Sequence, residues 1–318
     1  MKKTLLLVAS LIAALAVQAQ DIPRKTLTLV VGFAAGGAAD TAARLVAKKV
    51  GESLGQTVVV DNRAGAGGNI AHQFVANAVP DGSTILLGSI GPLAIAPHLM
   101  KLGYDPQRDL APLTLGMSFP NVLVVHQGVG AKTLAEFVAL AKKKPGSLDF
   151  ASTGAGSASH LAGELFNLVA GIDTVHIPYK GGAPALHDML AGRVASYYST
   201  LSTSQAHIES GKLIALASTG LTRPSFLPNV PTIAESGYPG FSATNWYAFV
   251  APGKTPLPVL ERWNQELVKA LNAPEVKAEL QKHGLTPQPG SRDELARLIV
   301  SETATWGKVI RDRKITAE

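Results

Sequence analysis

Two glycine-rich turns hold the residues best placed to do chemistry in this chain. The first, within "VVGFAAGGAADTAARLV", links an apolar run to a helical pattern and offers almost nothing but backbone. A helix N-terminus carries unpaired N–H donors and partial positive charge, and glycine lets a ligand approach the backbone. We expect N–H groups here to bind an anion such as a carboxylate, with tight packing alone as the alternative. The predicted site residues of this turn are Phe33, Ala35, Gly36, Gly37, Ala38 and Asp40, the last as a helix cap.

The second turn, "DFASTGAGSASHLAGELF", repeats the strand–turn–helix pattern and adds hydroxyl groups. Such hydroxyls bind an anion directly or cap the helix, and Ser157 suits a cap. We expect His160, three residues later, to brace the turn. Two such turns facing each other could hold both ends of a small diacid. The predicted site residues are Ser152, Thr153, Gly156, Ser157 and His160.

Two further segments complete the predicted site. "HIPYKGGAPAL" is a third turn, where Tyr179, Lys180 and Gly181 could meet a ligand, although a lone lysine in a loop is commonly solvated. Ser89 ends an apolar run, at the carboxyl edge where α/β sheets bind ligands. Phe33 and Tyr179 would suit an aromatic carboxylate or would simply pack. Aliphatic di- and tricarboxylates and aromatic acids therefore both stay open as ligands.

Other chemistries find little support in the residues. The spacing Gly154-x-Gly156-x-x-Ser159 imitates a dinucleotide-binding turn, but the third glycine is missing and Asp173 precedes its strand instead of ending it. There is no G-x-S-x-G elbow, no cysteine and no close pair of histidines. We therefore expect no catalytic residue, no cofactor and no metal.

Strand patterns alternate with helical ones, which predicts an α/β fold with mostly parallel sheets flanked by helices. Capping boxes at Thr133/Glu136 and Ser291/Glu294 predict helix starts, and Gly55 a helix end. Leu260, Trp263, Leu267 and Leu271 share one helical face. Strands are predicted at 26–33, 57–62, 83–89, 121–127, 148–153, 173–179, 194–200, 213–219 and 244–252, and helices at 40–54 and 70–79.

The chain has 318 residues, enough for two domains, and its C-terminal helical part is expected to return to the first. The predicted domains are 20–122 plus 249–318, and 123–248, joined by two connecting strands. Residues 1–19 are predicted to be a signal peptide, because Lys2 and Lys3 precede an apolar run that ends before Ala19. The net charge of +6 is scattered, so we expect no nucleic-acid partner.

The ordered motifs "GFAAGGAADTAARL", "VDNRAGAGGNIA", "DFASTGAGSASHLAGELF", "HIPYKGGAPALHDMLAGRV" and "LPNVPTIAESGYPGF" closely resemble the Bug-type solute-binding proteins of tripartite tricarboxylate transporters. The resemblance covers the chain from Ile22 onward. Two positions depart from the family pattern: Gly32 stands where a proline is usual, and Ala195 where an aspartate is frequent, which disfavours an amino-acid ligand.

The resemblance implies a two-domain periplasmic binding protein of type II, a Venus-flytrap that closes on its ligand. It implies carboxylate binding by main-chain groups at residues 33–40 and 152–160, in the periplasm, by a monomer. It also implies delivery of the carboxylate to the permease subunits of a tripartite tricarboxylate transporter. An exported α/β enzyme acting on a similar acid and a periplasmic sensor subunit are the alternatives.

Overall fold

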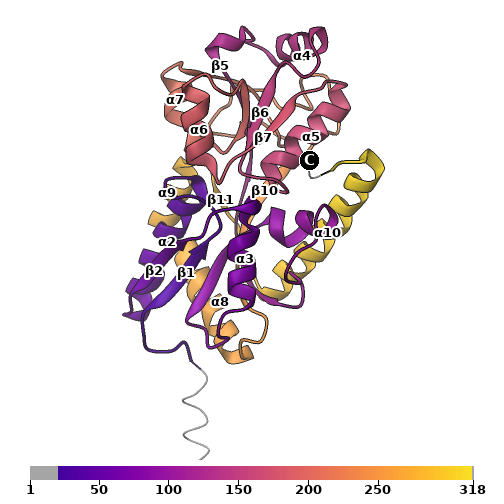
Figure 1. The fold of residues 1–318 in the computed structure, drawn as a ribbon. Helices are drawn as coiled ribbons and strands as arrows, with labels where there is room; N and C mark the ends of the chain where they lie inside the picture. Colours follow the sequence, from indigo (N-terminus) through magenta and orange to yellow (C-terminus); the bar gives the residue numbers. More distant parts are fainter. Residues whose placement is uncertain (1–20, 317–318) are drawn as a thin grey trace, which may run out of the picture.

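The computed structural model describes residues 21–316 and shows two lobes stacked end to end (Figure 1). The predicted signal peptide lies outside the described residues. Within 21–316, no helix is both long enough and apolar enough to cross a membrane.

The first lobe is built on a six-stranded sheet with the order β11-β4-β10-β3-β1-β2. β1 pairs in parallel with β2 and β3, whereas β10 is antiparallel to β3 and β4, and β11 to β4. The strands are β1 (Leu27–Val31), β2 (Val58–Asn62), β3 (Thr84–Ser89), β4 (Leu110–Pro120), β10 (Thr244–Pro252) and β11 (Thr286–Pro287). The helices of this lobe are α2 (Ala38–Leu54), α3 (Asn69–Ala76), α8 (Leu257–Asn272), α9 (Pro274–Lys282) and α10 (Arg292–Arg313), with the short η1 (Ala66–Gly68), η2 (Gly91–Ile95) and η3 (Ala96–His98).

The second lobe is built on a five-stranded sheet with the order β7-β6-β8-β5-β9. β6 is parallel to β7 and β8, and β5 is antiparallel to β8 and β9. The strands are β5 (Val122–His126), β6 (Asp149–Ser152), β7 (Val175–Pro178), β8 (Ser196–Ser199) and β9 (Leu213–Ser218). The helices are α4 (Leu134–Lys143), α5 (Ala158–Ala170), α6 (Gly182–Leu190), α7 (Leu201–Glu209) and the short η4 (Gln127–Val129).

Local sequence signals set the helix ends as predicted. Both capping boxes form, at Thr133 and at Ser291, each with its glutamate bonded back to the cap. Gly55 ends α2 with a φ of 63°, a conformation that favours glycine. Trp263 and Leu267 are fully buried on the predicted face of α8. Burial of each such side chain contributes about 1.5–3 kcal/mol.

The predicted α/β class is confirmed, but both sheets are mixed instead of mostly parallel. β4 was not predicted, because Pro112, Gly116 and Pro120 interrupt its strand pattern. Its pairing with β10 shifts register twice, passing over Gly116 and then Leu113. β4 and β10 form a long antiparallel pair at the centre of the first sheet, which the alternation of strand and helix patterns did not predict.

The chain passes between the lobes at Asn121, which joins β4 to β5, and again in the segment 219–243 before β10. Thr219 ties both passages together. It exchanges two hydrogen bonds with the backbone of Asn121 and two with that of Ala243, all 2.9 Å long. Sheet membership assigns β10 wholly to the first lobe; the domain boundaries themselves stay a prediction.

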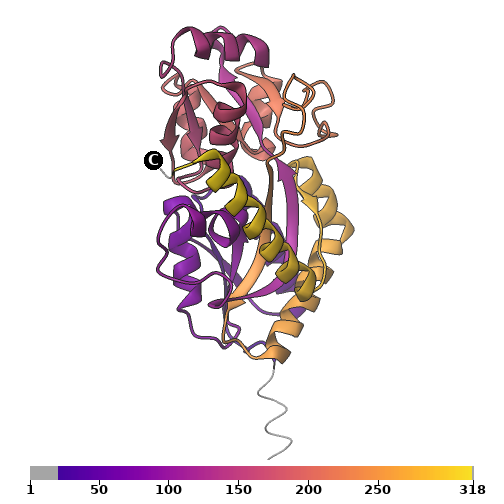
Figure 2. The ribbon, with the colours of Figure 1, turned by 90° about the vertical axis from the view of Figure 1, so that its right-hand side faces the viewer.

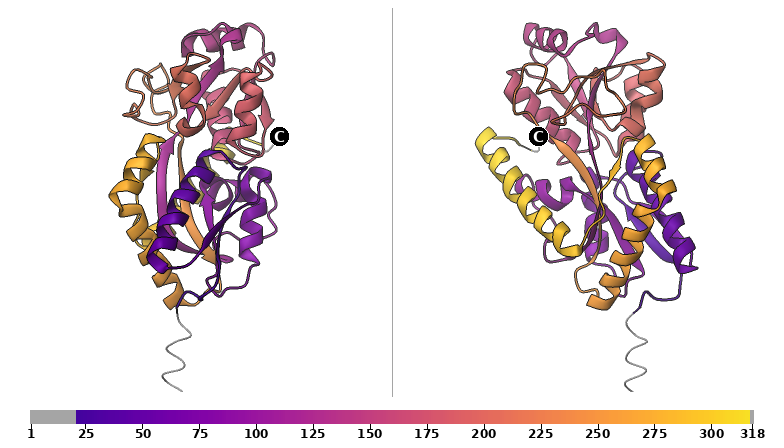
Figure 3. Two further views of the ribbon diagram at one scale, coloured as in Figure 1. Left: turned by 90° about the vertical axis from the view of Figure 1, so that its left-hand side faces the viewer. Right: turned by 180° about the vertical axis from the view of Figure 1, so that it is seen from behind.

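The C-terminal helix α10 returns along the first lobe, as expected from its position in the chain. It packs on β4 and η2 and runs diagonally up to the junction of the lobes (Figure 2). The view from behind shows β4 and β10 rising together toward the second lobe, with α10 to one side (Figure 3). Ile299 and Trp306 of α10 belong to a hydrophobic cluster that continues into the second lobe.

Candidate functional site

The first glycine turn joins β1 to α2 and leaves the start of that helix without a side-chain cap. The N-cap residue Gly37 has an extended backbone, and no side chain accepts a capping hydrogen bond from the first N–H groups of α2. The N–H of Gly36 donates to Asp40 Oδ2 at 3.0 Å, and Arg44 pairs with Asp40. Burial alone would raise the pKa of Asp40, but hydrogen bonds from Arg44, Gly36 and Asn62 lower it overall. The N–H of Gly36 is therefore engaged within the turn, and its use by a ligand stays a prediction. Asp40 accepts that bond but does not cap α2, so its predicted role as a helix cap is wrong.

The second turn, between β6 and α5, is held by its own side chains. Ser157 caps α5 as predicted, accepting from the N–H of His160 at 3.3 Å. The N–H of Gly154 donates to Ser152 Oγ at 3.0 Å, and Ser152 Oγ lies 2.6 Å from His176 Nε2. The N–H of Gly156 donates to His160 Nδ1 at 3.2 Å. The N–H of Gly156 is therefore engaged within the turn, and the contact of Gly156 with a ligand stays a prediction.

His160 braces this turn as a neutral imidazole. Burial and the neighbouring His176 lower the pKa of His160 to about 3, and burial lowers that of His176 to about 4. The two rings stack with centroids 4.0 Å apart. A neutral ring can keep Nδ1 as the acceptor for Gly156. Ser157 contacts the backbone of His160 and not its ring, which does not resemble a nucleophile and its base.

The third turn brings the lobes together through its backbone. The N–H of Ala34 donates to the carbonyl of Lys180 at 3.0 Å, across the junction. Tyr179 turns toward its own lobe, donating to Asp188 at 2.9 Å. Burial and that bond raise the pKa of Tyr179 to about 12. The Lys180 side chain is exposed, as a solvated lysine would be.

Glycines at four positions let the lobes touch backbone to backbone. A Cβ added at Gly67 would lie 2.3 Å from the carbonyl oxygen of Ala155, and one at Gly154 would lie 2.7 Å from the nitrogen of Gly67. At Gly91 it would lie 2.8 Å from the oxygen of Gly156, and at Gly181 2.9 Å from the nitrogen of Ala34. Such approaches exclude any side chain. We call these four residues, Gly67, Gly91, Gly154 and Gly181, the glycine seam.

Two helix N-termini meet at this junction. A Cβ added at Gly37, the N-cap of α2, would lie 3.7 Å from the nitrogen of Gly182, the first residue of α6. No side chain caps either helix. The first-turn N–H groups of a helix have no acceptor within it, and each N-terminus carries about half a positive charge. Two such ends face to face repel each other and favour an anion between or beside them.

A small cavity lies between the lobes, with a volume of about 10 Å³. That is about the room that one water molecule needs. The predicted residues Phe33, Ser89, Thr153 and Ser157 line it. No Lys, Arg, Asp or Glu is among its lining residues, which are Phe33, Ser89, Asn121, Thr153, Ser157, Ala158, Ser159, Tyr198, Thr200, Asn245 and Tyr247.

The other predicted residues do not line this cavity and belong to the turns described above. The prediction missed the lining residues at the passage between the lobes, in β8 and just after it, in β10 and at the start of α5, which are Asn121, Tyr198, Thr200, Asn245, Tyr247, Ala158 and Ser159. Asn121 and Asn245 did carry a signal, because each is an amide beside a buried apolar strand, where an unpaired polar group is costly.

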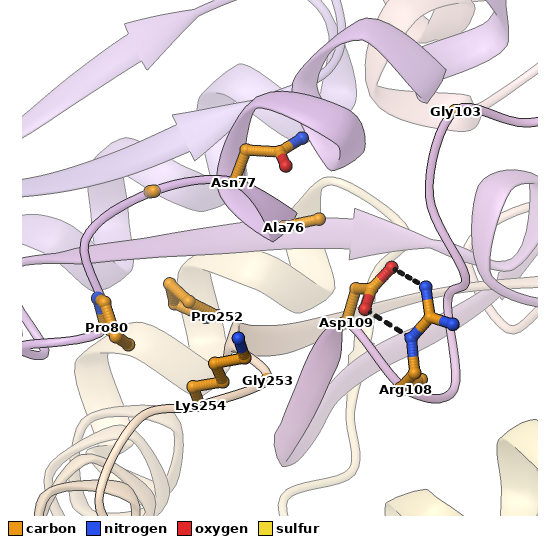
Figure 4. A pocket seen from close by; sticks show the side chains of 10 residues that line it. Ala76, Asn77, Pro80, Gly103, Arg108, Asp109, Pro252, Gly253 and Lys254 are labelled. Carbon is orange, nitrogen blue, oxygen red and sulfur yellow. Dashed lines mark hydrogen bonds and ion pairs between the residues drawn. The ribbon is translucent and has the colours of Figure 1, made fainter.

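A larger pocket, of about 830 Å³, lies elsewhere on the first lobe. It is lined by the end of α3, the loop before β4 and the turn after β10, with Arg108 paired to Asp109 (Figure 4). Because β10 is antiparallel to β3, this pocket lies at the end of the sheet opposite Ser89. None of the three glycine turns reaches it. Within residues 21–316, no group of three or more His, Asp or Glu is placed to hold a metal ion.

Two α/β lobes joined by two passages of the chain, with a cavity between them, are the architecture of solute-binding proteins, and the similar solved structures include the periplasmic binding protein BugD. The tripartite tricarboxylate transporter family receptor model matches residues 42–315, and the chain belongs to that family. It is 38% identical to Protein BugT of Bordetella pertussis over 93% of this chain and 91% of that one. The resemblance seen in the sequence is therefore confirmed.

Two solved structures of similar proteins contain ligands. The structure of R. palustris Rpa4515 with adipate has a TM-score of 0.89 and 35% identity, over 93% of this chain and 99% of that one. The structure of MatC from Rhodopseudomonas palustris with bound malate has a TM-score of 0.87 and 33% identity, over 91% and 99%. Both ligands are small aliphatic dicarboxylates.

Proposed function

We propose that this receptor captures a small organic carboxylate between its lobes and delivers it to the membrane subunits of a tripartite tricarboxylate-type transporter. The observation that carries the proposal is the meeting of two uncapped helix N-termini, at Gly37 and Gly181, at the same junction of the lobes as a cavity that no cationic side chain lines. Backbone dipoles would supply the positive potential that a carboxylate needs. The adipate and malate bound to relatives support the same ligand class.

The proposal includes export to the periplasm with removal of residues 1–19, function as a monomer, and no catalytic step. Ligand would bind the closed arrangement better than the open one, so that hinge movement at the two passages between the lobes accompanies capture. Ser89, Thr153, Ser157 and Phe33 would contact the solute directly. Gly37, Ala38 and the start of α6 would provide N–H groups to the carboxylate, while Asp40 and His160 hold their turns.

Calorimetry against a panel of mono-, di- and tricarboxylates and aromatic acids tests this function. We expect at least one acid to bind with micromolar or tighter affinity, about −8 kcal/mol, and to raise the melting temperature. Gly37→Val should weaken that binding, because its methyl groups would point toward Gly182. Absence of binding by every acid, with a correctly folded protein, would refute the proposal.

A further inference from the structure

Three polar side chains around the cavity each carry a buried atom that has no hydrogen-bond partner in the described part of the chain. Ser89, Asn121 and Asn245 are only 4%, 1% and 8% exposed, and all three line it. Within residues 21–316, nothing pairs with Ser89 Oγ, Asn121 Nδ2 or Asn245 Oδ1. An unpaired buried polar group costs about 1–3 kcal/mol. Native proteins contain few such groups, so three around one cavity require an explanation.

The fold does not need these polar atoms. The backbone of Asn121 is held by Thr219 on both its N–H and its carbonyl. Asn245 pairs through its backbone with Phe119 of β4, and Ser89 is paired with Tyr247 of β10. Apolar side chains at these three positions would satisfy the sheets equally well and would avoid the penalty. The polar atoms therefore serve what occupies the cavity.

The three atoms specify the chemistry of that occupant. Asn121 Nδ2 is a donor, Asn245 Oδ1 an acceptor, and Ser89 Oγ can be either. A carboxylate only accepts and would leave Asn245 Oδ1 unpaired. An ammonium group only donates and would leave Asn121 Nδ2 unpaired. A hydroxyl group both donates and accepts, and it brings no charge to a cavity that has no charged lining.

We propose that the ligand is a hydroxy acid, whose hydroxyl group is bound by Asn121, Asn245 and Ser89 while its carboxylate meets the helix N-termini. The inference rests on the proposed function and narrows its ligand class. It concerns side chains at the end of β3, at the passage after β4 and in β10, which are separate from the glycine turns that would hold the carboxylate.

Matched pairs of acids that differ by one hydroxyl test the inference by calorimetry: malate and succinate, 2-hydroxyglutarate and glutarate, 4-hydroxybenzoate and benzoate. For the pair whose carbon skeleton the receptor binds, we expect the dissociation constant of the hydroxylated acid to be at least tenfold lower than that of the acid without the hydroxyl. A site built to bond a hydroxyl discriminates strongly against the analogue that lacks it, because the polar groups of the site then stay unpaired.

Two variants test whether Asn245 and Ser89 cause this difference in affinity. In Asn245→Leu, and independently in Ser89→Ala, the ratio of the two dissociation constants within the pair should fall toward one. Asn264→Leu is the control, because Asn264 bonds to the carbonyls of Leu113 and Gly290, away from the cavity. It should lower stability and leave the ratio unchanged.

The outcomes separate the two proposals. If acids bind but every pair gives a ratio near one, the three atoms hold only water, and this inference fails while the proposed function stands. A ratio that survives both Asn245→Leu and Ser89→Ala also overturns it. If no acid binds at all, the proposed function itself fails.

Discussion

Replacing Gly91 by alanine tests whether the glycine seam sets the affinity of the receptor. Gly91 begins η2 in the first lobe and faces the second turn of the other lobe. Its φ is not positive, so alanine fits the backbone of the first lobe without strain. In a helical position the exchange even favours folding by about 0.5–1 kcal/mol. The added methyl group would clash only with atoms of the second lobe, where the two lobes are in contact.

The size of the effect follows from the contact distances. The new Cβ would lie 2.8 Å from the oxygen of Gly156 and 3.1 Å from Ser157 Cα, whereas ordinary contact begins at 3.4 Å. Both atoms belong to a turn braced by His160, so they cannot yield easily. Overpacking of this kind costs about 1–3 kcal/mol. Because the penalty falls on the closed arrangement alone, affinity should fall about 5- to 150-fold.

Calorimetry with the tightest-binding carboxylate measures this loss, and small-angle scattering with and without the acid measures closure. Gly128→Ala is the matched control, because Gly128 is exposed and its added Cβ would meet only the His126 ring. It should bind and close like the native chain. If Gly91→Ala also retained native affinity and native compaction with ligand, the seam would not determine closure and the reasoning would be refuted.

Two further predictions concern stability. Burial lowers the pKa of His160 to about 3 and of His176 to about 4, from 6.5. Between pH 6.5 and 5 only the unfolded chain gains these protons, so the free energy of unfolding should decrease as the pH is lowered, by up to about 1.4 kcal/mol per pH unit for each histidine. A free energy of unfolding that stays constant over this range in urea titrations would contradict the prediction. Ser89→Ala should raise the free energy of unfolding of the ligand-free protein by about 1 kcal/mol while weakening ligand binding, because it removes an unpaired buried hydroxyl; a loss of stability in chemical denaturation would count against it.

The sequence predicted most strands and the helix ends because those depend on local patterns. The run before Gly32 and the capping box at Thr133 are examples. β4 was lost because Pro112 and Gly116 break its pattern. The mixed sheets could not be foreseen either, since the pairing of β4 with β10 joins segments more than a hundred residues apart, and no local pattern encodes the direction of such a pairing.

Part of the candidate site was predictable for the same reason. Ser157 and its turn carry a short, recognisable strand–turn–helix pattern. Asn245 and Tyr247 instead lie within β10, where alternate residues face opposite sides and the sequence does not say which side meets the cavity. The hydrogen bonds from the N–H groups of Gly36 and Gly156 to Asp40 and His160, 3.0 and 3.2 Å long, were also hidden, because they depend on the detailed folding of each turn.

The four bonds made by Thr219 limit how the two halves of this molecule can rearrange. With Asn121 and Ala243 fastened to the same buried residue, the two passages cannot slide independently, and shear along the long axis is resisted. We expect the lobes to rotate relative to each other near Thr219, where both passages are fixed. Under the proposed function, the angle between the lobes would then be the difference between the loaded and the empty receptor.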